Sequence, residues 1–194
     1  MFSRSGASGT GKTSLTAKAI ENARDIEGIK IFRFIGTTSP SSDTYKLLFQ
    51  LMSQIIREYG VEMNSLLSKG EDEKKFASVE GLRDIFARSL KLAVREKPLF
   101  IFLDALDQLR GEYASMPEYW LPDEIPEDVK IIVSVLPEMK ERLLNTVIYE
   151  IKPMSRDDGM ELLDKWLASI SRTLQRDQKE EVLNKFAVIC TPLY

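Results

Sequence analysis

A short glycine-rich segment near the N-terminus constrains this chain more than any other feature of its sequence. Gly6 and Gly11 are separated by four residues, and Lys12 and Thr13 follow Gly11 directly. This spacing matches the loop that holds phosphate groups between a strand and a helix. Glycines are needed there because a Cβ atom would obstruct the approach of the backbone amides to phosphate oxygens, or the positive φ angles of the loop.

The loop predicts a site for ATP or GTP with Mg²⁺. We expect Lys12 to supply a positive charge to the β- and γ-phosphates and the Thr13 hydroxyl to ligate Mg²⁺. The amides at the start of the following helix would point at the same anion. The predicted contacts are Gly6, Ala7, Ser8, Gly9, Thr10, Gly11, Lys12, Thr13 and Ser14. A flexible N-terminus with a chance match is the alternative, but an amphipathic helix and a partner motif follow the loop.

The partner motif is an apolar strand that ends in a carboxylate, the Walker B pattern. Residues 99–103 read LFIFL, and Asp104 follows them. A strand buried on both faces has this composition. We expect Asp104 to hold Mg²⁺ through water, since Mg²⁺ in proteins keeps several waters and binds few carboxylates.

The residues after Asp104 bear on hydrolysis. Many ATPases place a glutamate directly after the metal-binding aspartate to activate water, and this chain has Ala105 there. Asp107 is the nearest candidate general base, and Gln108 could orient water without taking its proton. Alternatively, Asp107 only caps the next turn. We therefore assign Lys12 and Asp107 as the candidate catalytic residues and expect slow hydrolysis, that is, a weak ATPase.

Helical and strand-like segments alternate, which predicts an α/β fold: helices on both faces of a mostly parallel, five-stranded sheet. The expected strands after the first are 29–35, 99–103, 129–136 and 147–151. The expected helices are 12–24, 44–59, 79–94, 138–144, 157–171 and 176–190, and residues 61–75 form a polar loop. We place a boundary near Pro153, so that 1–153 is the core and 154–194 begins a helical subdomain. Only five residues precede Gly6 and the last helix stops abruptly, so we expect both ends to be truncated.

Composition excludes several kinds of site. The chain has no histidine, which removes zinc chemistry and histidine-based triads, and its only cysteine, Cys190, lies in an apolar run typical of a buried thiol. A net charge of −3 and a pI of about 5.3 give no basic field for nucleic acid. No apolar stretch is long enough for a membrane span or a signal peptide. These features predict a cytoplasmic protein.

Three segments together resemble a known family. The glycine loop, residues 102–109 (FLDALDQL) and residues 32–51 (FRFIGTTSPSSDTYKLLFQL) are similar to NACHT-type STAND NTPases, the signal-transduction ATPases with numerous domains, and among them to nephrocystin-like and NACHT–WD-repeat proteins. The final residues, Thr191 to Tyr194, resemble the motif of that family's helical subdomain whose proline lies near adenine. The resemblance therefore assigns Pro192 to the nucleotide site, although a proline there is also a simple helix terminator.

The resemblance implies an ATP/ADP-controlled switch, inactive with ADP, in which ATP exchange releases a surface for homo-oligomerisation. It favours ATP over GTP and protein partners bound through flanking domains that this sequence lacks, among them the winged helix. Many family members sense the γ-phosphate with an arginine after the fourth strand. Leu136 occupies that place here, and Ser134 remains as a polar candidate. Both this loss and Ala105 imply slow hydrolysis.

Other functions are weighed against this one. A P-loop kinase or phosphotransferase would need an arginine-rich lid, and a GTPase would need an Asn-Lys-x-Asp motif; neither is present. A module that interacts without nucleotide is disfavoured by the intact Lys12, Thr13 and Asp104. Arg33 and Arg156 are also candidate arginine fingers, but Arg33 lies within an expected strand and Arg156 adjoins the start of an expected helix, which is the simpler explanation of each. Trp120 and Trp166 are expected to be packing residues.

Overall fold

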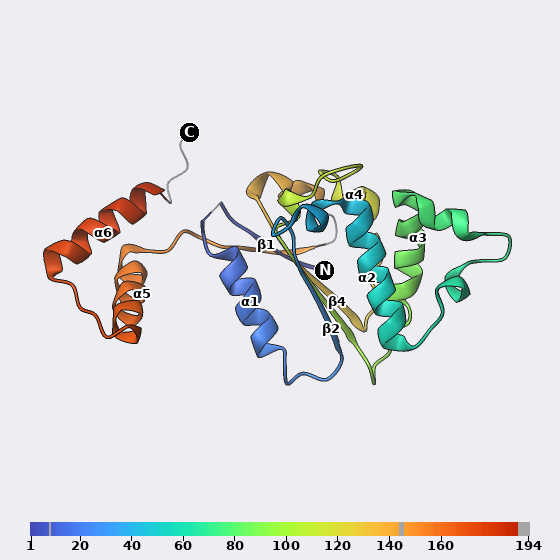
Figure 1. The fold of residues 1–194 in the computed structure, drawn as a ribbon, viewed down its shortest axis with the longest axis horizontal. Helices are drawn as coiled ribbons and strands as arrows, with labels where there is room; N and C mark the ends of the chain where they lie inside the picture. The colour runs from blue at the N-terminus through green and yellow to red at the C-terminus, as the bar shows by residue number, and fades with distance from the viewer. Residues whose placement is uncertain (8, 144–145, 190–194) are drawn as a thin grey trace.

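The computed structural model describes residues 1–7, 9–143 and 146–189, and its ribbon shows helices on both sides of a central sheet (Figure 1). The sheet has five strands in the order β2-β3-β4-β1-β5, and all of its neighbouring pairs are parallel. The strands are β1 Phe2–Ser5, β2 Ile29–Phe34, β3 Leu99–Asp104, β4 Val129–Val135 and β5 Val147–Glu150. The predicted three-layer α/β fold is confirmed.

The strand order places the short first strand inside the sheet. β1 pairs with β4 on one side and with β5 on the other. The segment before Gly6 therefore forms the strand from which the glycine loop leaves. β3, which ends in Asp104, is separated from β1 by β4 alone. The carboxyl ends of these three parallel strands consequently meet at one edge, where open α/β sheets bind their ligands.

The helices are α1 Lys12–Asn22, α2 Thr44–Tyr59, α3 Val79–Leu90, α4 Pro117–Trp120, α5 Arg156–Ser169 and α6 Arg176–Ile189. Figure 1 shows α1 on one side of the sheet and α2 with α3 on the other, with α5 and α6 beyond the end of the sheet. Among the residues described, no helix is both long enough and apolar enough to cross a membrane.

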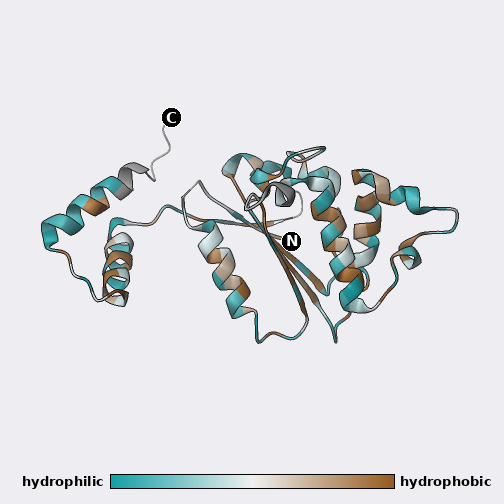
Figure 2. Ribbon diagram, in the orientation of Figure 1, coloured by the Kyte–Doolittle hydropathy of each residue, from teal (hydrophilic) through white to brown (hydrophobic). Residues whose placement is uncertain are grey.

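The hydrophobic core lies between the sheet and the α2–α3 pair. α2 begins at Asp43, whose carboxylate accepts a hydrogen bond from Lys46 N–H, and ends at Gly60 in a left-handed conformation. Its apolar residues recur at helical spacing and most of them are buried, and Figure 2 shows hydrophobic stretches along the helix. The main hydrophobic cluster includes Leu47, Leu48, Leu51, Met52 and Ile55 of α2, Leu82, Ile85, Phe86 and Leu90 of α3, and Leu99, Ile101 and Leu103 of β3.

The opposite face of the sheet is packed differently. The only residue of α1 that is buried is Thr16, and Ala23 is buried just after its end. The predicted apolar side of this helix is wrong at Leu15, which is 43% exposed. α1 is therefore held at its N-terminal end by polar contacts of Thr16, which bring it over the end of β3.

Three predicted boundaries differ from the structure. The helix expected over 79–94 ends at Leu90, and Val94 pairs with Lys97 in an isolated bridge. The segment expected as the helix 138–144 is a 3-10 helix, Pro137–Arg142. The polar loop 61–75 contains 3-10 turns and is anchored to α3, because Arg88 Nη2 donates to Glu71 Oε1 at 2.9 Å. This ion pair and its neighbours order a segment that composition alone marks as solvated.

The C-terminal helices form a pair of their own. α5 begins at a capping box in which Ser155 and Asp158 exchange hydrogen bonds. The two helices are joined by polar contacts, including Lys179 Nζ to Asp164 Oδ1 at 2.5 Å. Among the side chains that the structure describes, the main hydrophobic cluster contains none from either helix. Cys190 and Pro192 lie outside the described residues.

Candidate functional site

The glycine loop folds into a compact turn between β1 and α1. A Cβ atom at Gly6 would lie 2.8 Å from the carbonyl oxygen of Ile151 and 2.8 Å from Thr10 Oγ1. Gly9 and Gly11 have φ angles of +80° and +86°, which only glycine adopts readily. Position 6 thus requires glycine because neighbouring atoms lie too close for a Cβ atom, and positions 9 and 11 favour glycine because of their positive φ angles. Ser8, also predicted to contact phosphate, lies outside the described residues.

Lys12 is folded onto the loop that precedes it. Its ammonium donates to the carbonyl oxygens of Gly6 at 2.6 Å and of Ala7 at 2.8 Å. An ammonium group has three donors, so one remains available to an anion. Gly11 caps the N-terminus of α1 without a side-chain hydrogen bond. The first-turn amides of α1 and the third donor of Lys12 are therefore available to an anion bound at the loop.

Asp104 is 2% exposed, and hydroxyl groups hold one of its oxygens. Ser134 Oγ lies 2.6 Å from Asp104 Oδ1, and Thr16 Oγ1 lies 3.2 Å from the same atom. The N–H of Ala105 donates to Ser134 Oγ at 2.8 Å. The hydroxyl of Ser134, which the sequence offered as a contact to the γ-phosphate, is thus turned toward Asp104. Thr16 was not identified from the sequence.

The turn after β3 carries Asp107 and has an unusual start. Ala105 adopts a left-handed conformation with φ 60° and ψ 57°. Asp107 Oδ2 accepts a hydrogen bond from Gln108 Nε2 at 2.6 Å, while Oδ1 is buried and has no hydrogen-bond partner among the described residues. Gly36 (φ +85°) lies against Gln108, where an added Cβ would be 3.0 Å from the Gln108 Cβ. The turn is therefore fixed in place, and Gln108 is engaged by Asp107.

Two cavities flank the glycine loop, and both include Gly9 and Gly11 in their lining. The first, of about 350 Å³, is lined by Gly9, Gly11, Lys12, Thr13, Ala105, Asp107, Gln108, Ser134 and Leu136. The second, of about 560 Å³, is lined by Gly9, Thr10, Gly11, Ser14, Leu15, Lys18, Ile151, Pro153, Met154 and Leu162. The structure thus brings Lys12, Thr13 and Asp107 to one cavity and Ser14 to the other.

The wall of the second cavity could not be read from the sequence. Pro153, Met154 and Leu162 come from the segment after β5 and from α5, and they face the start of α1. The only sequence signal for Leu162 is the apolar spacing of α5, which does not say which element the helix faces. This cavity is mainly apolar, whereas Lys12 is the only cationic residue in the lining described for the first cavity.

A second cation lies close to Asp104. Arg4 on β1 is the register partner of Ser134 on β4. Burial lowers the pKa of the Arg4 guanidinium, and the negative charge of Asp104 opposes that shift. The Nη1 atom of Arg4 is buried without a hydrogen-bond partner in the described part of the chain. Since an arginine stays protonated in proteins, the buried carboxylate has a positive charge nearby.

The two other arginines considered from the sequence make contacts elsewhere. Arg33 Nη2 donates to Gln54 Oε1 at 2.8 Å on the α2 side of the strand edge. Arg156 donates to Asn184 Oδ1 at 3.0 Å and is paired with Glu180, which joins α5 to α6. Neither residue lines either cavity beside the glycine loop.

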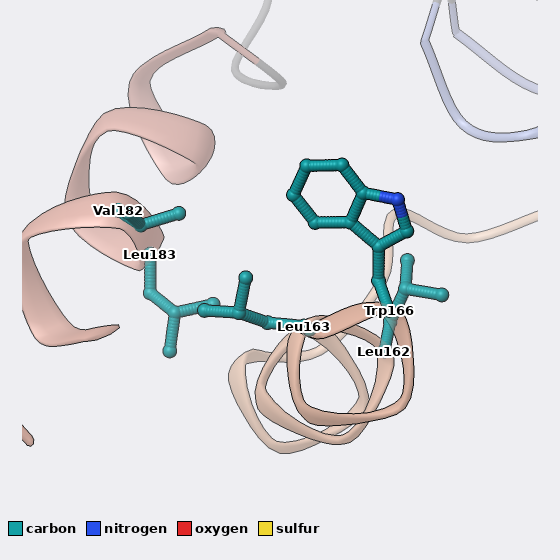
Figure 3. A pocket seen from close by; sticks show the side chains of 6 residues that line it. Leu162, Leu163, Trp166, Val182 and Leu183 are labelled. Carbon is teal, nitrogen blue, oxygen red and sulfur yellow. The ribbon is translucent and has the colours of Figure 1, made fainter. Parts of the chain in front are cut away.

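The tryptophan prediction is half correct. Trp120 is fully buried, but Trp166 is 61% exposed, so its assignment as a packing residue is wrong. Figure 3 shows Leu163 and Leu183 pointing toward each other across a pocket of about 400 Å³, with Trp166 on its rim. Leu162 belongs both to this pocket and to the apolar cavity beside the glycine loop. The periodicity of α5 could not distinguish a packing face from an exposed one.

Comparison with known proteins gives relatives over most of the chain. The family described as Nephrocystin 3, N-terminal, matches residues 1–140. "NACHT and WD repeat domain-containing protein 2" of Mus musculus is 31% identical over 95% of this chain, and Nephrocystin-3 of Xenopus laevis is 26% identical over 98%. This chain spans only 11% and 14% of those proteins.

A solved structure supports the fold independently. The Walker-type ATPase of Pyrococcus abyssi superposes with a TM-score of 0.56 over 94% of this chain and 57% of that protein, at 18% sequence identity. Such low identity supports the architecture only. Since its model matches residues 1–140, the chain belongs to the nephrocystin 3 N-terminal family, and its fold is that of a Walker-type ATPase.

Proposed function

We propose that this chain is a Mg²⁺–ATP-binding regulatory module with slow hydrolysis, acting within a larger signalling or scaffold protein. The observation that carries the proposal is the arrangement of Lys12, Thr13 and Asp107 around one cavity, with Asp104 buried beside it. We take residues 1–153 as the nucleotide-binding core and 154–194 as the start of a helical subdomain.

The residues present fit a nucleotide and its metal. The glycine loop supplies a concave backbone that side chains at Gly6, Gly9 and Gly11 would disturb. Thr13 and Asp104 offer the oxygen ligands that Mg²⁺ prefers. Bound Mg²⁺ would neutralise charge on the β- and γ-phosphates. The first cavity, lined by Lys12 and Thr13, suits phosphates and is the phosphate cavity of this proposal. The second, bounded by Pro153, Met154 and Leu162, is mainly apolar and suits a nucleobase.

Slow hydrolysis is supported by the composition of the phosphate cavity. Ala105 brings no carboxylate to the position after Asp104, and Leu136 brings no positive charge at the end of β4. Asp107 is then the candidate base, because it is the only carboxylate that lines this cavity among the described residues. Its hydrogen bond from Gln108 keeps Oδ2 engaged. A kinase reading is disfavoured, since Lys12 is the only cation lining this cavity among the described residues.

The test is a titration with fluorescent ATP, ADP and GTP analogues in Mg²⁺, with phosphate release followed in the same samples. We expect ATP to bind more tightly than GTP, and Lys12→Ala to weaken binding by at least about tenfold, because a charged hydrogen bond contributes about 1.5–3 kcal/mol. Asp104→Ala should weaken binding only when Mg²⁺ is present. Lys46→Ala, at an exposed lysine on α2, is the matched control and should bind like the wild type.

Two results would contradict the proposal. Equal binding by Lys12→Ala and the wild type would mean that the loop does not hold phosphate, and a nucleotide-independent interaction module would replace it. Turnover at or above about 1 s⁻¹, the range of ordinary enzymes, would contradict slow hydrolysis. Urea unfolding of each variant separates lost binding from lost folding.

A further inference from the structure

Ser134, on β4, contacts both Asp104 and the turn that follows β3. It lies near the end of β4, between the strands that carry the glycine loop and Asp104, and its side chain is 1% exposed. Its hydroxyl donates to Asp104 Oδ1 at 2.6 Å, and its oxygen accepts the N–H of Ala105 at 2.8 Å. A serine hydroxyl has one proton, so its donor is committed to the carboxylate.

The second hydroxyl near Asp104 is a weaker partner. Thr16 Oγ1 lies 3.2 Å from Asp104 Oδ1 and also 3.0 Å from the carbonyl oxygen of Lys12. Its single proton is shared between two acceptors, while Ser134 makes the shorter bond to Oδ1 alone. Both hydroxyls contact the same oxygen, and within the described residues no hydrogen bond reaches Oδ2.

We propose that Ser134 is a positioning residue for the metal site, an inference that rests on the proposed binding of Mg²⁺ with nucleotide. By holding Oδ1 it orients the carboxylate of Asp104 and leaves Oδ2 free for the water molecules of Mg²⁺. By accepting the Ala105 N–H it also holds the left-handed turn that carries Asp107 into the phosphate cavity.

Ser134 is suited to this position because a buried carboxylate must be satisfied by hydrogen bonds, and a serine hydroxyl can donate one. β4 pairs with β1 and β3, so its backbone fixes where the hydroxyl lies. The simpler alternative is that Ser134 only stabilises the fold by satisfying a buried charge. The two differ in whether loss of the hydroxyl changes the metal dependence of binding.

The experiment measures ATP affinity in Mg²⁺ and in EDTA for the wild type, Ser134→Ala and Ser134→Thr. We expect Ser134→Ala to lose about tenfold of the affinity gained from Mg²⁺, corresponding to about 1.4 kcal/mol, with the affinity in EDTA unchanged. Ser134→Thr keeps the hydroxyl and should restore most of the metal dependence. Ser89→Ala, which removes a buried hydroxyl from α3, is the control and should leave the ratio of affinities unchanged.

Hydrogen exchange supplies a readout that does not depend on ligand. The Ala105 amide should exchange faster in Ser134→Ala and at the wild-type rate in Ser89→Ala, because only the first loses the acceptor for that amide. If the alanine variant does not fold, Ser134→Cys keeps nearly the same volume with only a weak S–H donor. It should likewise reduce the affinity gained from Mg²⁺ and speed exchange of the Ala105 amide.

The inference is overturned if Ser134→Ala keeps the wild-type ratio of affinities in Mg²⁺ and EDTA, or weakens binding equally in both. Either result would leave the proposed function standing, since the wild type would still bind nucleotide. No nucleotide binding by the wild type would instead overturn the proposed function together with this metal role.

Discussion

The left-handed conformation of Ala105 predicts how replacing this residue changes the free energy of unfolding. An L-residue in this region costs roughly 1–2 kcal/mol, and Ala105 has φ 60° and ψ 57°. Replacing it with glycine removes that cost but adds about 0.5–1 kcal/mol of backbone entropy in the unfolded chain. Ala105→Gly should therefore stabilise the protein by about 0.5–1 kcal/mol. Ala87→Gly, at a right-handed and similarly half-buried position in α3, should instead destabilise it by about 1 kcal/mol.

Urea unfolding distinguishes the two variants by the direction of the change. With a urea m value of about 2 kcal/mol per molar, the midpoint should rise by about 0.3–0.5 M for Ala105→Gly and fall by about 0.5 M for Ala87→Gly. The buried Trp120 is the probe, and a Trp166→Phe background removes the exposed second tryptophan. A midpoint that falls equally in both variants would refute the assignment of conformational strain to Ala105.

Two further predictions concern α3 and the loop before it. Gly81→Ala would place a Cβ 1.9 Å from a backbone carbonyl oxygen, so we expect a loss of about 2 kcal/mol in a urea titration, and an unchanged midpoint would contradict the close approach. Hydrogen bonds from Arg88 hold the pKa of Glu71 well below its usual 4.5, so this contribution is complete above about pH 4.5 and declines as the pH falls. Glu71→Gln should therefore lose less stability than the wild type between about pH 5 and about pH 3, and parallel loss would contradict the pair.

The sheet and the glycine loop could be predicted from sequence because their signals are local. The buried strand before Asp104 and the apolar spacing of α2 both correspond to elements that the structure contains. Lys12 is likewise positioned by Gly6 and Ala7, which lie close to it in the chain. Local patterns carry this information because strand and helix periodicities act over a few residues.

Features that depend on strand order could not be predicted in this way. Ser134 reaches Asp104 because β4 lies between β1 and β3, and no periodicity in the sequence states that order. The same holds for the burial of Arg4 near Asp104. The exposure of Leu15 and Trp166 could not be predicted either. Amphipathic spacing identifies a helix without identifying what covers its apolar side.

The position of β1 has a consequence for the order in which the protein forms during synthesis. Phe2 pairs with Ile132 on β4 and with Val147 on β5, so both neighbours of this strand follow it by more than a hundred residues. At a translation rate of about 5–20 residues per second, β5 is made roughly 7–30 s after β1. The glycine loop therefore leaves the ribosome well before the two strands that support β1. Until those strands emerge, the α2–α3 layer and the β2–β3 pair can assemble without it, so the sheet around the glycine loop is completed only after β4 and β5 have been made.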